Sequence, residues 1–202
     1  MKYIKIKRVL DFILTFIFSI PSIIILLFCI IAIKIESKGP AFFKQVRPSY
    51  KGRLFIIYKL RTMIVDTNSA EGQPLSDMQR MTKSGNIIRK CSFDELPQLF
   101  NIIKGDMSFI GPRPLLPQYL SLYSAEQMRR HDVLPGISGL AQVNGRNAIS
   151  WDEKFKLDVW YVDHISFSLD CQIFIKTILN IIRREGINQS GDKTIEGFKG
   201  NN

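Results

Sequence analysis

Residues 12–33 have the sequence FILTFIFSIPSIIILLFCIIAI, a run of 22 residues without one charged side chain. At about 1.5 Å per residue, an α-helix of this length reaches roughly 33 Å, enough to cross the hydrocarbon core of a bilayer. A secretory signal peptide fits less well, because the run is longer than a usual hydrophobic region and no small-residue cleavage site follows it. The stretch therefore predicts a membrane-embedded helix.

Two features predict that this helix enters and leaves the membrane on the same side. Pro21, flanked by Ser19 and Ser22, removes a backbone hydrogen bond in mid-run and is expected to kink the helix. Both flanks are basic, and the positive-inside rule then pulls both ends to the cytoplasmic side. The basic residues are Lys2, Lys5, Lys7, Arg8, Lys34, Lys38 and Lys44. We expect residues 1–36 to form a re-entrant helix hairpin; a straight span with a tolerated proline is the alternative.

The composition favours one domain with an anionic partner. The chain has 202 residues, and 28 Lys and Arg against 18 Asp and Glu give a net charge of +10. This excess excludes an acidic solvating protein and indicates nucleic acid, lipid headgroups or phosphorylated substrates as partners. Cys29, Cys91 and Cys171 have no paired spacing and the two histidines are isolated, which argues against a disulfide framework and a zinc site.

Beyond the membrane segment, the patterns predict a mainly α-helical domain with a short β-hairpin, an α+β fold. The hairpin is expected at residues 41–61 and helices at about 85–104, 115–131, 151 onward and 167–184. The last helix has a broad apolar face that suits either a core or an in-plane membrane helix. Residues 66–80 and 135–147 are expected to be loops, and the polar tail after Gly186 to be loosely held. The hairpin holds six basic residues and no acidic one, which fits a headgroup-facing surface or a phosphate site equally well.

Asp94 and Glu95 form an adjacent carboxylate pair just before an apolar helical stretch. A capping box starting at Ser92 is the structural alternative, although Pro97 fits a helix start nearer Asp94 better. At a helix N-terminus the dipole favours the ionised carboxylates and also attracts phosphate. An ionised carboxylate at this position can act as a nucleophile or as a ligand for Mg²⁺.

Arg113 lies between two prolines in the segment Gly111-Pro112-Arg113-Pro114. The prolines fix the backbone, and a rigidly held guanidinium suits bidentate phosphate binding. A plain turn with a solvated arginine is the alternative. Lys59 and Arg89 are weaker candidates when each is taken alone.

Five motifs, taken together, resemble those of the bacterial sugar transferases, the monotopic phosphoglycosyl transferases. They are Lys7-Arg8-Val9-x-Asp11, Tyr58-Lys59-x-Arg61-Thr62-Met63, Asp94-Glu95-Leu96-Pro97-Gln98, the stretch from Lys104-Gly105-Asp106 to Pro112-Arg113-Pro114, and the stretch from Pro135-Gly136-Ile137 to Asn144-Gly145-Arg146. The likeness runs from the N-terminus to the Gly-Phe-Lys-Gly-Asn tail. In one departure, relatives break the membrane helix at an adjacent Ser-Pro pair, whereas Ser19-Ile20-Pro21-Ser22 lies about one turn earlier, so the hairpin apex is expected to differ in position.

The resemblance implies a compact domain on the cytoplasmic face of the bacterial inner membrane, with a catalytic unit at residues 37–186 and a polar tail at 187–202. Besides the re-entrant hairpin, in-plane amphipathic helices would hold it there. The implied reaction moves a sugar 1-phosphate from a UDP-sugar to undecaprenyl phosphate and releases UMP, through a covalent aspartyl phosphosugar intermediate. This is the first membrane step of glycoconjugate or N-glycan assembly. The likeness favours UDP-N,N'-diacetylbacillosamine as donor, with another UDP-N-acetylhexosamine left open.

The same resemblance implies roles for individual residues. Asp94 would be the nucleophile and Glu95 the Mg²⁺ ligand. Lys59, Arg89 and Arg113 would hold phosphates, with Asp170 as a further acidic substrate-site position and Arg146 near the nucleotide. Asp11, Ser19, Pro21 and Ser22 would belong to the membrane hairpin. Expected partners are the UDP-sugar, undecaprenyl phosphate, inner-membrane lipid and downstream glycosyltransferases, without nucleic acid.

A membrane-anchored adaptor that binds anionic lipid or nucleic acid through its basic face is the competing hypothesis. It predicts basic residues without an organised carboxylate and metal site, and strongly salt-dependent binding without turnover. The absence of a nucleic-acid-binding motif in the sequence argues against it.

Overall fold

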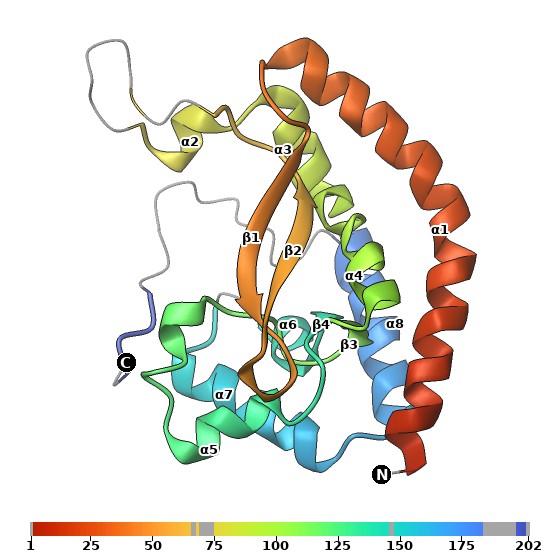
Figure 1. Cartoon of the computed structure of the whole chain (residues 1–202), viewed down its shortest axis with the longest axis vertical. Helices are drawn as coiled ribbons and strands as arrows, with labels where there is room; N and C mark the ends of the chain where they lie inside the picture. The colour runs from red at the N-terminus through yellow and green to blue at the C-terminus, as the bar shows by residue number, and fades with distance from the viewer. Residues whose placement is uncertain (1, 66–67, 69–74, 146–147, 184–196, 201–202) are drawn as a thin grey trace.

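The computed structural model describes residues 2–65, 68, 75–145, 148–183 and 197–200 (Figure 1). Its helices are α1 (Lys2–Glu36), α2 (Asp77–Arg80), α3 (Lys83–Lys90), α4 (Gln98–Lys104), α5 (Ala125–Met128), α6 (Leu140–Val143), α7 (Trp151–Asp163) and α8 (Phe167–Arg183). The strands are β1 (Phe42–Pro48), β2 (Leu54–Leu60), β3 (Ser108–Ile110) and β4 (Gly136–Ser138). Short 3₁₀ turns are η1 (Tyr50–Gly52), η2 (Phe93–Glu95), η3 (Pro117–Tyr119) and η4 (Arg129–His131). The predicted mainly helical fold with a short hairpin is confirmed.

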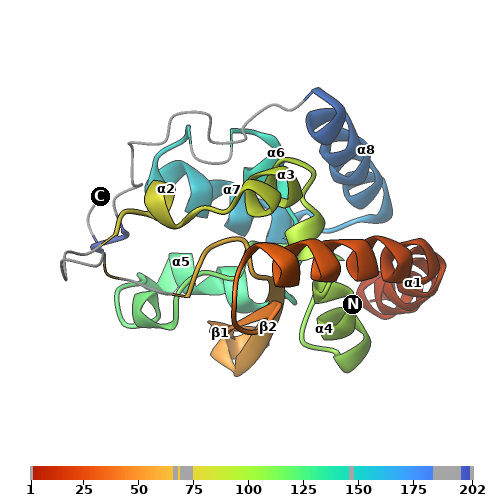
Figure 2. The same cartoon turned by 90° about the horizontal axis from the view of Figure 1, so that it is seen from above.

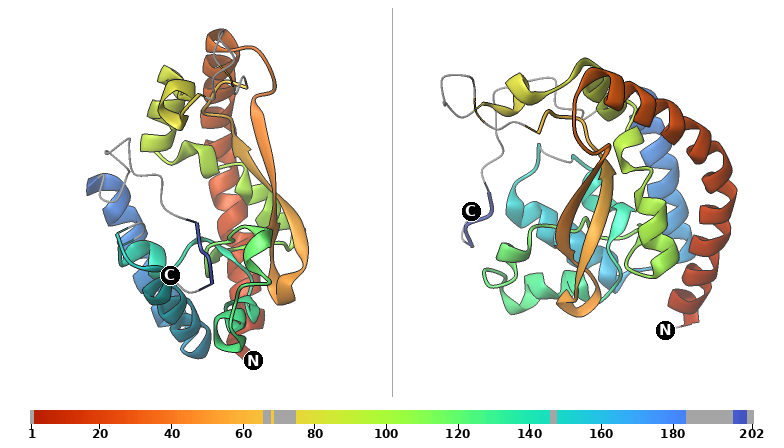
Figure 3. Two further views of the ribbon diagram at one scale, coloured as in Figure 1. Left: turned by 90° about the vertical axis from the view of Figure 1, so that its left-hand side faces the viewer. Right: turned by 45° about the horizontal axis from the view of Figure 1, so that its top comes forward.

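Helix α1 runs unbroken through Pro21 and curves along one side of the molecule (Figure 1). The structure therefore does not confirm the predicted hairpin of two helices. The Thr15 hydroxyl donates to the Asp11 carbonyl (2.7 Å) and the Ser19 hydroxyl to the Thr15 carbonyl (2.6 Å). Such bonds bend a helix, and Pro21 removes one more backbone bond in the next turn. The deformation is thus spread along a curved helix, which Figure 3 shows from two further directions.

The two faces of α1 have the polarity opposite to that of a helix on a soluble protein. The buried stripe toward the domain includes Lys7, Asp11, Thr15 and Ser22. The outer face is apolar, and Phe16, for example, is 75% exposed. This helix is long and apolar enough to cross a membrane, and only 11% of its most apolar window is buried inside the protein. A polar inner stripe with an apolar outer face is typical of a helix in contact with lipid.

The N-terminal half of α1 is tied to the domain by polar contacts. The Asp170 carboxylate in α8 accepts hydrogen bonds from the Tyr3 hydroxyl and the Lys7 ammonium, both at 2.6 Å. Asp11 accepts from the Ser108 hydroxyl (3.0 Å) and the Phe109 amide (3.1 Å) in β3. These contacts join α1 to α8 and β3.

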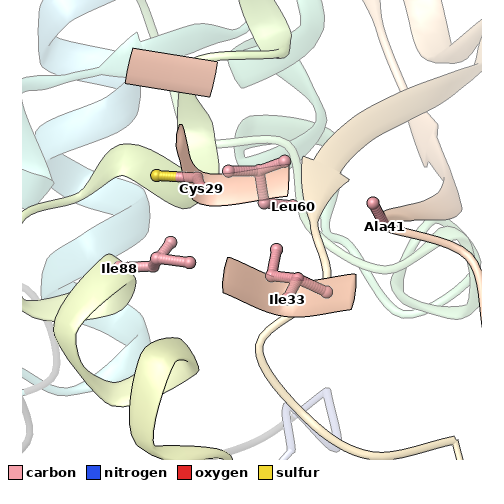
Figure 4. Packing of buried hydrophobic residues seen from close by; sticks show 5 residues of the cluster. All are labelled: Cys29, Ile33, Ala41, Leu60 and Ile88. Atoms are coloured by element: carbon pink, nitrogen blue, oxygen red, sulfur yellow. The ribbon is translucent and has the colours of Figure 1, made fainter. Parts of the chain in front are cut away.

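The C-terminal half of α1 is tied to other parts of the same domain. Cys29 and Ile33 pack against Ala41, Leu60 and Ile88 (Figure 4). At the end of the helix, the Glu36 carboxylate accepts the backbone amides of Lys83 (2.6 Å) and Ser84 (2.8 Å) and so caps α3. Both halves of α1 therefore contact one folded unit.

The β1–β2 hairpin has two chemically distinct faces, because side chains alternate along each strand. The antiparallel register pairs Phe43 with Lys59 and Arg47 with Phe55. The inner face carries Phe55 and Ile57, which belong to a core cluster with Leu99 of α4. The outer face, which includes Val46, Leu54 and Ile56, is exposed.

The parallel pair β3–β4 brings two motifs together that are distant in the sequence. Gly111 donates to the Ser138 carbonyl (2.9 Å) and Gly136 to the Pro112 carbonyl (3.0 Å). A Cβ atom on Gly136 would lie 2.2 Å from the Gly111 nitrogen, so the two backbones can approach only with glycine there. The prediction that residues 135–147 are only a loop is wrong, since β4 and α6 fall inside it.

Three other predictions need correction. The expected helix over residues 85–104 is interrupted between α3 and α4, where Ser92 has the left-handed φ of 57°. The expected helix over 115–131 consists of η3, α5 and η4. In the tail, Phe198 is only 4% exposed and packs among aromatic rings, 4.9 Å between ring centres from Phe155. This part of the tail is therefore anchored by apolar burial.

Candidate active site

Glu95 is the centre of a three-residue charge cluster. Its Oε1 atom accepts from Lys59 Nζ (3.0 Å) and from the Arg113 guanidinium (3.1 Å). Lys59 comes from β2, Glu95 from η2 and Arg113 from the segment after β3. No residue in the described part of the chain donates a hydrogen bond to the other oxygen, Oε2. The structure thus brings three of the predicted site residues together.

The charge cluster keeps Glu95 ionised. Burial opposes its charged form, but the nearby Lys59 and Arg113 outweigh that effect and hold the pKa of Glu95 at about 2. In the opposite direction, the Glu95 charge raises the pKa of Arg113. At neutral pH Glu95 is therefore a carboxylate with one oxygen engaged by cations.

Asp94 has different surroundings from its neighbour in sequence. No residue that the structure describes donates a hydrogen bond to its side chain. Burial, followed by the Glu95 charge, raises the pKa of Asp94 against the opposing charges of Lys59, Arg89 and Arg113. Asp94 is thus a half-buried carboxylate without a hydrogen-bond donor in the described chain, and the charges of Lys59, Arg89 and Arg113 act on it.

The backbone before Asp94 explains this placement. Ser92 takes the left-handed conformation after α3, and its side chain makes no capping hydrogen bond. The capping box considered as an alternative is therefore not formed. A 3₁₀ turn over Phe93–Glu95 precedes α4, which begins at Gln98 with Pro97 as its N-cap. The reversal at Ser92 directs Asp94 and Glu95 toward β2 and the Arg113 segment.

A buried ion pair holds the backbone of Arg113 in place. Arg130 donates to the Arg113 carbonyl (2.8 Å) and pairs with Asp158 of α7 at 2.6 Å. The side chains of this pair are 2% and 5% exposed. Together with the glycine contacts of β3–β4, the pair fixes the Pro-Arg-Pro backbone. No sequence pattern predicts this pair, because an isolated Arg and an Asp 28 residues apart have no characteristic spacing.

Arg47 belongs beside the site and was not predicted as a site residue. It shares the inner hairpin face with Lys59. Burial, followed by the charge of Arg113, lowers the pKa of Arg47 to about 10. Arg47 could not be singled out among the six basic residues of the hairpin. Only the strand register shows which of these residues lie on the inner face.

The remaining predicted residues lie in different places. Arg89 is exposed in the last turn of α3, where its charge acts on Asp94. All hydrogen bonds of the Asp170 carboxylate within the described chain go to Tyr3, Lys7 and Tyr161, so the structure does not bring it to Glu95. Arg146 lies outside the described residues.

Glu95 suits one divalent cation held jointly with a substrate. Among the described residues no group of three or more His, Cys, Asp and Glu side chains could hold a metal. Mg²⁺, however, is usually bound by one or two carboxylates together with substrate phosphates and water. The unbonded Oε2 of Glu95 fits that pattern.

Comparison with known proteins points to the family whose motifs the sequence resembles. A family model described as "Bacterial sugar transferase" matches residues 2–184. The chain is 50% identical over 194 residues to the uncharacterized sugar transferase EpsL of Bacillus subtilis (strain 168), covering 96% of each chain.

Two further relatives carry substrate names. The UDP-N-acetylgalactosamine-undecaprenyl-phosphate N-acetylgalactosaminephosphotransferase of Aeromonas hydrophila is 42% identical over 89% of this chain, which spans 44% of that protein. The UDP-glucose:undecaprenyl-phosphate glucose-1-phosphate transferase of Caulobacter vibrioides is 36% identical over 87% of this chain and 69% of its own length. These matches confirm the resemblance seen in the motifs and the expected class of enzyme. With residues 2–184 matched, the chain belongs to the bacterial sugar transferase family.

Proposed function

We propose that this protein transfers a sugar 1-phosphate from a UDP-sugar to undecaprenyl phosphate and releases UMP. The observation that carries the proposal is the Asp94 carboxylate, which has no hydrogen-bond donor in the described chain and directly precedes Glu95 in the charge cluster with Lys59 and Arg113. Relatives whose names specify undecaprenyl phosphate as acceptor support the same reaction class.

In the first step, an Asp94 carboxylate oxygen attacks the phosphorus that carries the sugar. A bond forms between that oxygen and the phosphorus, the bridging bond of the diphosphate breaks, and UMP leaves with the bridging oxygen. In the second step, a phosphate oxygen of undecaprenyl phosphate attacks the same phosphorus, and the Asp94 carboxylate is released. The free, partly desolvated carboxylate suits this role, because it needs to break no hydrogen bond before attack.

The cations offset the repulsion between an anionic nucleophile and a diphosphate. Lys59 and Arg113 are already oriented by Glu95, so little reorganisation is needed when phosphate arrives. Mg²⁺, held by the unbonded side of Glu95, would supply further charge neutralisation on the leaving phosphate. The residues of the chain hold the phosphates and direct Asp94.

We further propose that α1 enters and leaves the cytoplasmic leaflet of the inner membrane without crossing it. The contacts of Lys7 and Asp11 at one half of α1, and of Ile33 and Glu36 at the other, support this topology. One folded domain contacts both halves, so both belong on its side of the membrane. The site then lies at the depth of lipid headgroups, where the phosphate of the acceptor is found.

The test of the proposed function is UMP release by the purified full-length protein in nanodiscs. Repeated turnover of a UDP-sugar to UMP should require undecaprenyl phosphate, beyond the single burst released without it, and EDTA should abolish turnover until Mg²⁺ is added. Glu95→Gln should weaken Mg²⁺ dependence and turnover together, because an amide is a poor ligand for a hard cation. Salt-dependent binding of anionic vesicles with no turnover would favour the basic adaptor instead.

As donor we propose UDP-N,N'-diacetylbacillosamine, on the motif resemblance alone. A panel of UDP-sugars in the same UMP assay should give it the highest kcat/KM. A higher value for UDP-glucose, UDP-galactose or UDP-N-acetylgalactosamine would replace it without affecting the reaction class.

A further inference from the structure

An apolar groove of about 520 Å³ lies between α1 and α4. Its lining includes Phe12, Thr15, Phe16, Ile17 and Ser19 from α1, and Ile103 from α4. Figures 1 and 2 show the two helices side by side, and the outward face of α1 carries exposed apolar side chains. The groove therefore opens on the side that carries the apolar outer face of α1.

The groove suits a hydrocarbon ligand. Thr15 and Ser19 supply its hydroxyls, and both already donate to carbonyls of α1 itself. Neither hydroxyl proton needs a partner from a ligand, so a polar ligand would gain little there. Rings and branched aliphatic side chains make up the rest of the lining.

The groove is also held in shape before any ligand binds. Arg8 of α1 donates to the Ile102 carbonyl (2.5 Å) and the Met107 carbonyl (3.1 Å), which pins the C-terminal end of α4 to α1. The same guanidinium lies 4.3 Å from the centre of the Phe12 ring. A groove with fixed walls lowers the entropic cost of binding a flexible chain.

A continuous apolar stripe connects this groove to the active site. Leu96, Phe100 and Ile103 follow one another at helical spacing, and Leu96 is the residue directly after Glu95. Phe100 is 53% and Ile103 50% exposed, whereas Leu99 and Ile102 on the other side of α4 are buried in the core. By helical rise, the path from residue 95 to residue 103 is about 12 Å.

From this juxtaposition we infer that the groove between α1 and α4 binds the isoprenoid chain of the acceptor lipid. The inference rests on the proposed function, since it needs an acceptor whose phosphate reaches Asp94. With the phosphate beside Lys59 and Arg113, the chain must leave the site over exposed apolar surface, and the α4 stripe begins there. The chain passes Phe100, crosses Ile103 and fills the groove against Phe12 and Phe16.

The first experiment separates the two half-reactions in a variant with a filled groove. Ile103→Trp should raise the KM for undecaprenyl phosphate about tenfold, because the larger ring occupies the space of the chain. The burst of UMP from UDP-sugar without acceptor should be unchanged. The matched control is Ile175→Trp on the exposed face of α8, where the native isoleucine is 56% exposed, and its KM should stay as in the wild type.

Acceptor length gives a second readout that folding defects do not imitate. With a polyprenyl phosphate too short to reach Ile103, wild type and Ile103→Trp should have the same KM. An equal rise in KM for short and long acceptors, or an unchanged KM for undecaprenyl phosphate, overturns the inference. A wild type that releases no UMP even with undecaprenyl phosphate present would instead refute the proposed function.

Photocrosslinking tests the occupant directly and needs no stable tryptophan variant. Benzoylphenylalanine in place of Ile103 should crosslink radiolabelled undecaprenyl phosphate, and unlabelled undecaprenyl phosphate should compete while an equal amount of phospholipid should not. The same probe in place of Ile175 should show no such competition. Crosslinks at position 103 to phospholipid alone would show that bulk lipid occupies the groove and would contradict the inference.

Discussion

Asp94 and Glu95 are neighbours in the chain, yet their carboxylates have opposite electrostatic surroundings. Cations hold the pKa of Glu95 at about 2, whereas burial and the charge of Glu95 raise that of Asp94. Two adjacent carboxylates with pKa values pushed apart can take different roles, one as a permanent anion and the other as the reacting group. Glu95 has the low pKa because its Oε1 accepts both cationic donors, whereas Asp94 is half-buried and accepts no hydrogen bond within the described chain.

The raised pKa of Asp94 predicts the acid side of the pH profile. Asp94 must be ionised to attack, so the rate of the UMP burst should fall as the pH drops through a value above 3.8, the ordinary pKa of Asp. Glu95→Gln removes a charge that raises this pKa and should shift the acid limb to lower pH. Lys59→Met removes a charge that lowers it and should shift the limb to higher pH. Stopped-flow UMP detection measures both, and shifts in the same direction would show that another group titrates.

At the level of single residues, the sequence predicted most of the site through its motifs. Lys59, Glu95 and Arg113 do come together, Asp94 is the chain neighbour of Glu95, and Arg89 acts on Asp94 through its charge from the exposed end of α3. Arg47, Arg130 and Asp158 could not be predicted, because their positions depend on strand register and on contacts between distant helices. Asp170 accepts hydrogen bonds from Tyr3 and Lys7 and so anchors α1 to α8. A role of Asp170 at the substrate stays a prediction.

Among the elements, the parallel pair β3–β4 and helix α7 hold the Arg113 segment in place. The Arg130–Asp158 pair joins η4 to α7 in the protein interior, where its side chains are 2% and 5% exposed. The Arg129–Asp163 pair joins the same two elements, but its side chains are 38% and 41% exposed. Removing one partner of a buried pair leaves an uncompensated charge, whereas exposed pairs contribute little.

This contrast predicts different outcomes for the same substitution at two positions of α7. Asp158→Asn should lower the free energy of unfolding by about 3–5 kcal/mol, and Asp163→Asn by less than about 1 kcal/mol. Because Arg130 holds the Arg113 carbonyl, Asp158→Asn should also raise the KM for the UDP-sugar. Denaturant unfolding in detergent micelles and the UMP assay measure the two effects. Equal losses of stability would contradict a special role for the buried pair.

The long elements were predictable and the short ones were not. The long apolar run predicted a membrane helix where α1 lies. The strand-forming residues on either side of a turn in residues 41–61 predicted the hairpin. Many residues contribute to each of these patterns. Strands β3 and β4 have three residues each, too few for a periodic signal, and they exist because Gly111 and Gly136 allow two backbones to touch. Phe198 was missed for a similar reason, since one apolar residue in a polar tail has no pattern.

On the scale of the whole molecule, the decisive feature is that one domain contacts both halves of a helix long enough to span a bilayer (Figure 3). A straight crossing would move Lys7 or Glu36 to the far side and break its contacts. The same-side topology that we propose from these contacts is also the one that the basic flanks predict. The sequence did not predict a continuous curved helix, because the Thr15 and Ser19 bonds that bend α1 depend on three-dimensional geometry.

The topology can be tested by labelling from each side of the membrane. Lys2→Cys and Lys38→Cys, each in a background without other reactive thiols, should both react with a membrane-impermeant maleimide only from the cytoplasmic side. Periplasmic labelling of either position in spheroplasts would show that α1 crosses the membrane.

The covalent step on Asp94 is the central claim, and a single mixing experiment tests it most directly. Enzyme and UDP-sugar, mixed with Mg²⁺ but without undecaprenyl phosphate, should release UMP in a burst stoichiometric with enzyme, and mass spectrometry should find a phosphosugar adduct on the peptide containing Asp94. Asp94→Asn should lose the adduct and at least about a thousandfold in rate, without the loss of about 1 kcal/mol in stability that removal of a helix cap causes. No burst, or an adduct on Glu95, would contradict the assignment of Asp94 as nucleophile.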